Sequence, residues 1–376
     1  MIKLKGLTWD HPRGYDSVVA ATTAYEKTRP DIQVIWRKRS LKDFGDQPLQ
    51  EFIKEFDLLM IDHPSVGEAH QNHLLTRLEL ILPENFLSEQ SDLHIGKTLR
   101  SYNYHNHQYA IPIDASAQFS AFNDLSLSPN EIPETWDQFK EMMSQTSFSE
   151  KVIWPLCPTD FWCSFLTISA QYAGKHKKVF NSSGIDPDIA VRALILIKTF
   201  SENIPNESWK INPIQALELM KKGRYTFAPL LFGYISYSQK GSPVKFSNAL
   251  AVNSQNPVSL LGGVGLAISA YTRNKKECAE FMQFILQDEI LSGCYFENNG
   301  QPSLLSSWNS GVLNKESKNF FANTMESMNN AFVRPRIPGF NKFQESAARY
   351  LHENFRRTSE IRLIDHLNHL YTIHCL

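Results

Sequence analysis

A short segment, Ile111-Pro112-Ile113-Asp114, sets a proline between two alternating isoleucines. Proline has no amide hydrogen to donate to a β-ladder, so this pattern is typical of a strand end or a sheet edge. Further along, Thr135 and Gln138 have the spacing of a capping box, which predicts a helix that starts at about Trp136. The segment is thus expected to be a strand that leaves one domain.

Length and composition narrow the class of protein. A chain of 376 residues is longer than one ordinary core requires, which predicts two domains. Hydrophobic residues make up 42% and charged residues 20%, which excludes fibrous and disordered proteins. The formal net charge is -1 and basic tracts are limited to short groups such as Arg356-Arg357. We therefore expect neither a nucleic-acid partner nor binding to an anionic membrane.

The N-terminus and the cysteines bear on location. No apolar run approaches the roughly 20 residues that span a bilayer, so no membrane insertion is expected. Residues 1–9 carry positive charges but precede no apolar signal core and no cleavage site. We expect a cytoplasmic protein, or a periplasmic or extracellular one whose signal was replaced by a start methionine. The five cysteines are scattered and odd in number, which predicts free thiols.

The first sixty residues predict a parallel α/β arrangement. Ile2–Trp9 has the character of a strand, a helix is expected from about Tyr15 to Thr28, and the alternating residues of Ile32–Trp36 predict a second strand. Strand, helix and strand at this spacing form a βαβ unit, which implies a parallel sheet. Phe56–Ile61 is mostly apolar, as in a strand that is buried on both faces.

Several motifs together resemble extracellular solute-binding proteins of the maltose-binding type. They are the segment 107–114, the runs 121–125 and 132–139, the glycine-rich strand 261–269 and the late segment 332–339. The resemblance implies an α/β, two-lobed, periplasmic-binding-protein-like (type II) fold with hinge crossings and a ligand cleft between the lobes. We expect lobe one to comprise residues 1-112 and 261-308, and lobe two to comprise 113-260 and 309-376.

Two Asp-His-Pro turns are the first candidate site. Asp10 and His11 follow the first predicted strand, and Asp62 and His63 follow the third. Ligands of parallel sheets bind outside the carboxyl ends of the strands, so both turns are expected to face the cleft. The helix near Tyr15 adds amides suited to an anionic or hydroxyl group. One alternative is that the aspartates only cap their turns. Another is a zinc or iron site, but neighbouring side chains on an extended backbone point apart, so one turn rarely supplies two metal ligands. We predict no metal and no cofactor.

Aromatic side chains supply the other candidates, because the resemblance implies sugar rings stacked on aromatic faces from both lobes. The alternative role for each aromatic ring is packing in a core. The alternative role for Arg336 is that of an ordinary surface residue. The candidates beyond the two turns are Trp9, Trp162, Phe232 and Tyr234 as stacking rings, Asp114 and Asp160 as acceptors, Gly262 and Gly263 at the second crossing, and Arg336 for an anionic group.

The resemblance implies a solute-binding protein like those of ABC importers. Such a protein captures a small polar ligand, such as a carbohydrate, by lobe closure, presents it to a permease and is expected to be a monomer. No nucleophile elbow, phosphate loop or dinucleotide fingerprint occurs in the sequence, and no catalytic residue is predicted. The alternative is a cytosolic enzyme or ligand sensor on the same fold, with the histidines of the two turns as general acid and base.

Overall fold

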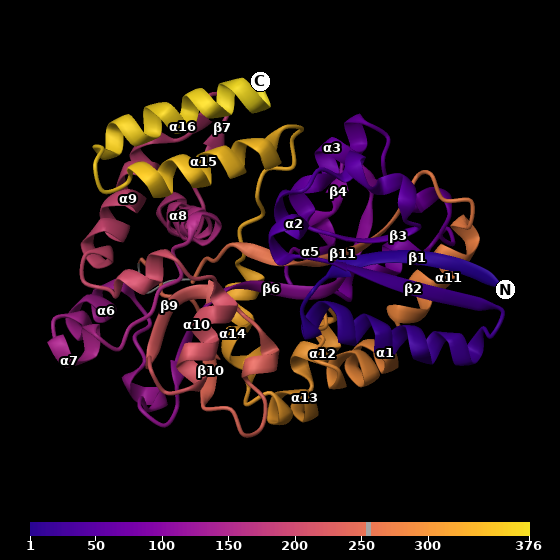
Figure 1. Ribbon diagram of the computed structural model, residues 1–376, viewed down its shortest axis with the longest axis horizontal. Helices are drawn as coiled ribbons and strands as arrows, with labels where there is room; N and C mark the ends of the chain where they lie inside the picture. The colour runs from indigo at the N-terminus through magenta and orange to yellow at the C-terminus, as the bar shows by residue number, and fades with distance from the viewer. Residues whose placement is uncertain (253–256) are drawn as a thin grey trace. The chain divides into compact units, whose positions relative to one another are not determined.

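The computed structural model describes residues 1–252 and 257–376 and divides into two compact units (Figure 1). Unit 1 contains Met1–Ser116, Gly262–Asn314 and Arg336–Pro338. Unit 2 contains Ala117–Leu261, Lys315–Pro335 and Gly339–Leu376. Each unit is therefore assembled from stretches that lie far apart in the sequence.

The sheet of unit 1 is built on β1 (Ile2–Trp9), which pairs in parallel with β2 (Ile32–Arg39) and with β3 (Leu58–Ile61). This pairing confirms the predicted βαβ unit. β11 (Leu261–Ile268) pairs antiparallel with β3, and the first part of β6 (Ala110–Asn123) lies beside β11. The polar turns after β1 and β3 consequently leave the same edge of the sheet.

α1 (Pro12–Thr28) covers one face of the β1–β2 pair (Figure 1). Its buried face includes Val18, Ala21 and Tyr25, which belong to one apolar cluster with residues of β1 and β2. The helix begins at Pro12 and not near Tyr15, so that prediction was wrong by one turn. The reason is that proline suits the first helical position and the preceding His11 caps the helix.

The remaining parts of unit 1 are short elements around the sheet. They are α2 (Leu41–Asp46), α3 (Val66–Gln71), α4 (Phe86–Glu89), α5 (Thr98–Ser101), the hairpin β4 (Asn103–Tyr104) and β5 (His107–Gln108), α11 (Lys275–Ile285), a π-helical segment (Ile290–Tyr295) and α12 (Leu305–Asn309), with 3-10 turns at Leu49–Glu51, Ile53–Glu55, His63–Ser65, Leu78–Leu80 and Gln90–Asp92. α13 (Gly311–Glu316) begins in unit 1 and ends in unit 2.

Unit 2 is centred on the second part of β6, which pairs antiparallel with β9 (Phe227–Phe232) and β10 (Val244–Ser247). Its helices are α6 (Trp136–Met143), α7 (Thr146–Ser149), α8 (Pro158–Ala173), α9 (Pro187–Ser201), α10 (Pro213–Lys221), α14 (Phe320–Asn329), α15 (Phe340–Asn354) and α16 (Glu360–Cys375), with a small hairpin of β7 (Phe180–Asn181) and β8 (Gly184–Ile185) and 3-10 turns at Pro129–Glu131, Asn206–Trp209 and Ile235–Tyr237.

The local signals for helix starts in unit 2 are confirmed. Thr135 and Gln138 form the predicted capping box, and α6 starts at Trp136. The Asp186 side chain accepts a hydrogen bond from the Ile189 amide at 3.1 Å, with proline at the first position of α9. Capping side chains of this kind supply partners that the first helical amides lack within the helix.

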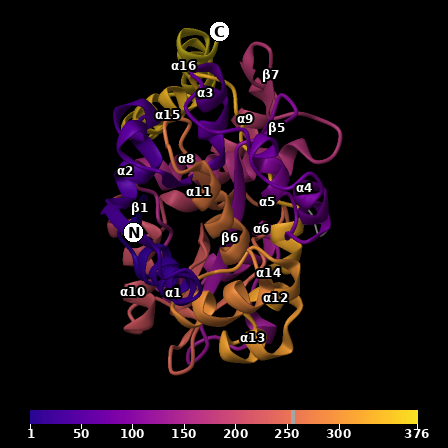
Figure 2. The ribbon, with the colours of Figure 1, turned by 90° about the vertical axis from the view of Figure 1, so that its right-hand side faces the viewer.

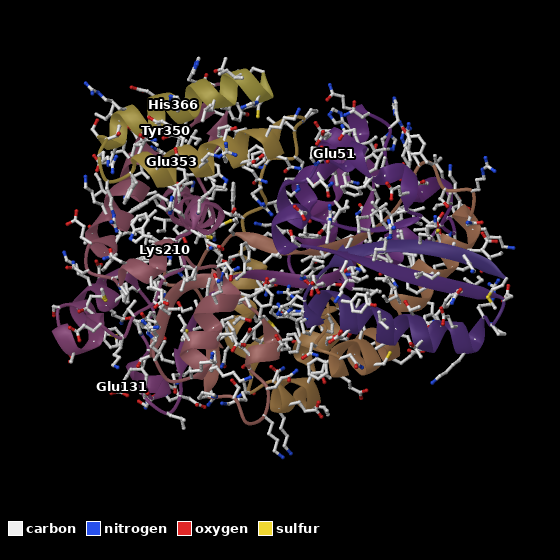
Figure 3. All side chains as sticks on the ribbon, in the orientation of Figure 1. Glu51, Glu131, Lys210, Tyr350, Glu353 and His366 are labelled. Carbon is white, nitrogen blue, oxygen red and sulfur yellow. The ribbon has the colours of Figure 1, made fainter. Side chains whose placement is uncertain are left out.

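The last two helices of unit 2 pack as an antiparallel pair. α15 and α16 lie side by side in both orientations (Figure 2). Tyr350 of α15 stacks on His366 of α16, with ring centroids 3.7 Å apart (Figure 3). In the part of the chain that the structure describes, no helix is both long and apolar enough to cross a bilayer. All five cysteines are free, as predicted.

Candidate functional site

The turn after β1 holds its side chains close to α1. His11 occupies the position before the helix, and its Nδ1 atom accepts a hydrogen bond from the Arg13 amide at 3.1 Å. Burial and the Arg13 charge lower the pKa of His11 to about 4, so the imidazole is neutral at pH 7. Asp10 is exposed and pairs with Lys38 at 2.8 Å. This turn therefore presents a carboxylate outward and keeps a neutral imidazole against the helix.

The turn after β3 is built in a related way. The Asp62 carboxylate accepts a hydrogen bond from the His63 amide at 2.8 Å and lies 3.1 Å from His63 Nδ1. The His63 side chain is fully buried, and its ring meets Tyr102 edge-on. Because β1 and β3 are parallel neighbours, both Asp-His-Pro turns lie at the same edge of the unit 1 sheet.

A buried ion pair joins α1 to β6. The Arg13 Nε atom donates to Asp114 Oδ2 at 2.8 Å, and its Nη2 atom donates to Oδ1 at 2.5 Å. The two side chains are 5% and 0% exposed. Burial raises the pKa of Asp114, and the guanidinium opposes that rise. Asp114 thus has a protein partner, Arg13, that the sequence did not indicate, because no local spacing relates the two residues.

The glycine-rich strand β11 approaches β6 closely at one point. Gly263 has φ +97, and a Cβ atom there would lie 2.5 Å from the Asp114 carbonyl oxygen. Only glycine suits both the backbone angle and the contact. Gly263 therefore allows the two backbones to approach closely, next to the half-buried Gly262.

Two further candidates of unit 1 are engaged in packing or capping. Trp9 is 4% exposed and its ring lies 5.3 Å from that of Phe44. The Arg336 Nη1 atom donates to the carbonyl oxygen of Arg100 in α5, at 2.9 Å, and to that of Asn103 in β4. The guanidinium is thus engaged with backbone carbonyl oxygens of unit 1.

The unit 2 candidates Asp160 and Trp162 belong to the first turns of α8. Asp160 Oδ2 accepts a hydrogen bond from Cys157 Sγ at 3.0 Å. Burial raises the pKa of Asp160 to about 7, and the Cys157 contact opposes the rise. Trp162 is 1% exposed, packs on Phe165 and Phe343, and its Nε1 atom has no hydrogen-bond partner among the described residues.

The aromatic pair Phe232 and Tyr234 lies at the end of β9 and just beyond it. Phe232 is half-buried and Tyr234 is buried. The predicted contacts thus fall into two sets: Trp9, Asp10, His11, Asp62, His63, Asp114, Gly262, Gly263 and Arg336 in unit 1, and Asp160, Trp162, Phe232 and Tyr234 in unit 2. Ligand contact by these residues stays a prediction. Within residues 1–252 and 257–376, no three histidine, cysteine or acidic side chains are placed to hold a metal ion.

Solved structures of sugar-binding proteins are similar to this one. Maltose-bound MalE3 of T. maritima aligns with a TM-score of 0.82 at 18% identity, over 99% of this chain and 100% of that chain. A solute-binding protein of Thermotoga lettingae, bound with α-D-tagatose, aligns with a TM-score of 0.81 at 14% identity, over 98% and 100%. One from Agrobacterium radiobacter, in complex with ribitol, aligns with a TM-score of 0.78 at 17% identity, over 98% and 97%.

These likenesses confirm the predicted type II periplasmic-binding-protein fold. No curated protein matches the sequence. The sequence profile of the family described as bacterial extracellular solute-binding protein matches residues 18–295, which is more than half of the chain. The chain therefore belongs to the bacterial extracellular solute-binding protein family and is a solute-binding protein.

Proposed function

We propose that this protein captures a small carbohydrate or polyol and delivers it to an ABC permease. The observation that carries the proposal is the polar carboxyl edge of the unit 1 sheet, where Asp10 and His11 follow β1 and Asp62 and His63 follow β3. The carboxylates of Asp10 and Asp62 and the neutral imidazole of His11 are at least partly exposed at this edge, and such groups are suited to hydrogen bonds with hydroxyl groups. The similar proteins of known structure hold maltose, tagatose and ribitol, all of which are polyhydroxylated.

Binding accounts for this edge better than acid–base catalysis does. A general base works best with a pKa near the operating pH. The pKa of His11 is lowered to about 4, and its Nδ1 atom is already occupied by the Arg13 amide. His63 is buried beside Asp62. His11 is therefore poorly suited to exchanging protons near neutral pH, and the buried His63 is better suited to holding the turn after β3 in place.

The partner and the location follow from the same proposal. A solute destined for an importer is met outside the cytoplasmic membrane, so we infer a periplasmic or extracellular location and a permease as the receiving partner. We also infer a monomer, with the chain mass of 43.1 kDa. Light scattering coupled to size exclusion measures that mass directly, and a stable mass of twice that value contradicts the monomer.

A thermal-shift screen tests the ligand class. Purified protein is heated with maltose, tagatose, ribitol and, as controls, amino acids at equal concentration. A ligand that binds only the folded state stabilises it, by about 2.7 kcal/mol at a hundred times its Kd. We expect at least one sugar or polyol to raise the melting temperature in a concentration-dependent way. If none does, the carbohydrate proposal is wrong.

A further inference from the structure

A surface cavity of about 340 Å³ that is open to solvent lies along β2, between that strand and the turns that follow α2. Arg39, at the last position of β2, lines it together with Gln47 and Phe52. We propose that this cavity is a binding site for a compact oxyanion group, a carboxylate or a phosphate, and that Arg39 is the residue that binds it. The site deepens the proposed function, on which this step rests, by making the transported solute an acidic sugar derivative.

Arg39 differs from its two neighbours in its charge partners. The basic run at the end of β2 is Arg37-Lys38-Arg39. Arg37 pairs with Glu55 at 3.2 Å, and Lys38 pairs with Asp10 at 2.8 Å. For Arg39, the described residues provide no carboxylate within 4.0 Å. Among the described residues that line the cavity, which include Arg37, Lys38 and Glu55, Arg39 is therefore the cation without an ion-pair partner.

The described residues around Arg39 give its guanidinium only two weak hydrogen bonds. Its Nη2 atom donates to the Met60 carbonyl at 3.3 Å and its Nη1 atom donates to the Asp43 carbonyl at 3.4 Å, both of which are long contacts with neutral oxygens. Its Nε atom is buried and has no partner among the described residues. Burial lowers the pKa of Arg39 to about 10, with Asp43 opposing, so the group remains charged at pH 7. The two long contacts with neutral oxygens are weaker partners for a guanidinium than the charge-assisted hydrogen bonds that an anion would accept from it.

Two aromatic rings lie against the guanidinium of Arg39. Its Cζ atom lies 4.7 Å from the Phe52 ring centroid and 5.2 Å from that of Phe44. A planar guanidinium can bind the two oxygens of a carboxylate or phosphate side by side, which a lysine ammonium cannot do. The cavity exceeds by several times the roughly 30 Å³ that one water occupies in the liquid, so it has room for such a group.

The position in the fold agrees with a role in solute binding. β2 pairs in parallel with β1, and Arg39 lies opposite Trp9 in that register. Arg39 thus stands at the carboxyl edge of the sheet, one strand away from the turn that holds Asp10 and His11. An oxyanion carried on a sugar would bind here while its hydroxyl groups bind the neighbouring turns.

Isothermal titration with inorganic phosphate tests the site at constant ionic strength. The variants are Arg39→Gln, Arg39→Lys and the matched control Arg273→Gln, which removes the same charge from an exposed arginine of unit 1 outside the cavity. We expect saturable phosphate binding by the wild type and by R273Q, and a loss of about tenfold or more in R39Q, since hydrogen bonds to charged groups contribute about that much. R39K keeps the positive charge but loses the planar guanidinium, so its affinity for phosphate is expected to lie between those of the wild type and R39Q. Circular dichroism melts without phosphate establish that each variant is folded.

Two results overturn the site: no phosphate binding by the wild type, or equal binding by folded R39Q. A second titration, with glucose, glucose 6-phosphate and glucuronate, separates this inference from the proposed function. Preference for the two acidic sugars that disappears in R39Q supports both. Binding of neutral sugars alone, unchanged in R39Q, overturns the acidic-solute inference and leaves the proposed function standing. Phosphate binding with no response to any sugar supports the oxyanion site and contradicts the carbohydrate proposal.

Discussion

The Arg13 guanidinium and the Asp114 carboxylate form two hydrogen bonds, of 2.8 and 2.5 Å, although the residues are 101 positions apart in the sequence. Both side chains are buried. A buried pair of this kind gains less from mutual attraction than its geometry suggests, because both charges leave water. The pair matters for stability mainly when one partner is removed, because the remaining charge is then buried in unit 1 without a partner.

Replacing either member of this pair is expected to destabilise the protein strongly. Arg13→Ala or Asp114→Ala should each lower the free energy of unfolding by about 3–5 kcal/mol, because the remaining charge is buried without a partner. Urea denaturation measures the change. The double variant Arg13→Met with Asp114→Leu should cost clearly less than the sum of the two single changes. A cost below about 1 kcal/mol for both single variants would contradict a buried, coupled pair.

Gly263→Ala is expected to destabilise the crossing between β11 and β6. The residue has φ +97, and the added methyl group would lie 2.5 Å from the Asp114 carbonyl oxygen. A loss of about 1–3 kcal/mol is expected from the backbone strain. Gly311→Ala is the control, because a Cβ atom there meets nothing within 4 Å and its φ is not positive. Equal melting temperatures for the two variants would show that position 263 does not require glycine.

The raised pKa of Asp160 is expected to make the free energy of unfolding fall as the pH rises. Its folded pKa of about 7 lies above the ordinary value of 3.8, so between these values the folded state holds a proton that the unfolded state has released. Stability therefore decreases as the pH rises from about 4 to about 7, by up to about 1.4 kcal/mol per pH unit. Asp160→Asn removes this titrating group, so the stability of the variant relative to the wild type should increase as the pH rises over that range. A constant difference from pH 4 to pH 7 would contradict the raised pKa.

The lowered pKa of His11 is expected to make the free energy of unfolding rise with pH over an overlapping pH range. Its folded pKa of about 4 lies below the ordinary 6.5, so the unfolded state binds the extra proton between these values. Its contribution is present above pH 6.5 and is lost as the pH falls toward 4. His11→Asn keeps an oxygen that can cap α1 but does not titrate, so the variant should lose less stability than the wild type on acidification. His94, whose pKa burial lowers to about 3, is unchanged in both proteins and cancels in the comparison. Parallel stability curves for the two proteins would rule out the lowered pKa of His11.

Local chemistry explains what could be predicted from the sequence. The capping box of Thr135 and Gln138 and the Asp186 cap are decided by residues three positions apart, so the structure confirms both. The apolar run that contains β3 predicts a buried strand for the same reason. The early start of α1 was missed because histidine is not among the residues that usually cap a helix, and only the structure shows the His11 side chain turned toward the Arg13 amide.

The candidate site depended on contacts that no local pattern records. A sequence does not show that Asp114 meets Arg13, because that contact is created by the approach of β6 to α1. It also does not distinguish an aromatic ring in a core from one that meets a ligand, and Trp9 and Trp162 are both buried. Arg39 was passed over for a related reason: three consecutive basic residues look alike until the structure shows which of them have acidic partners.

Direct titration of the purified protein with sugars and polyols tests the central claim of solute binding. Isothermal titration with maltose, tagatose, ribitol and the acidic sugars glucose 6-phosphate and glucuronate measures affinity and stoichiometry together. The account predicts that at least one of these compounds binds saturably with one site per chain. If folded protein binds none of them, the proposal that this protein captures a carbohydrate is contradicted.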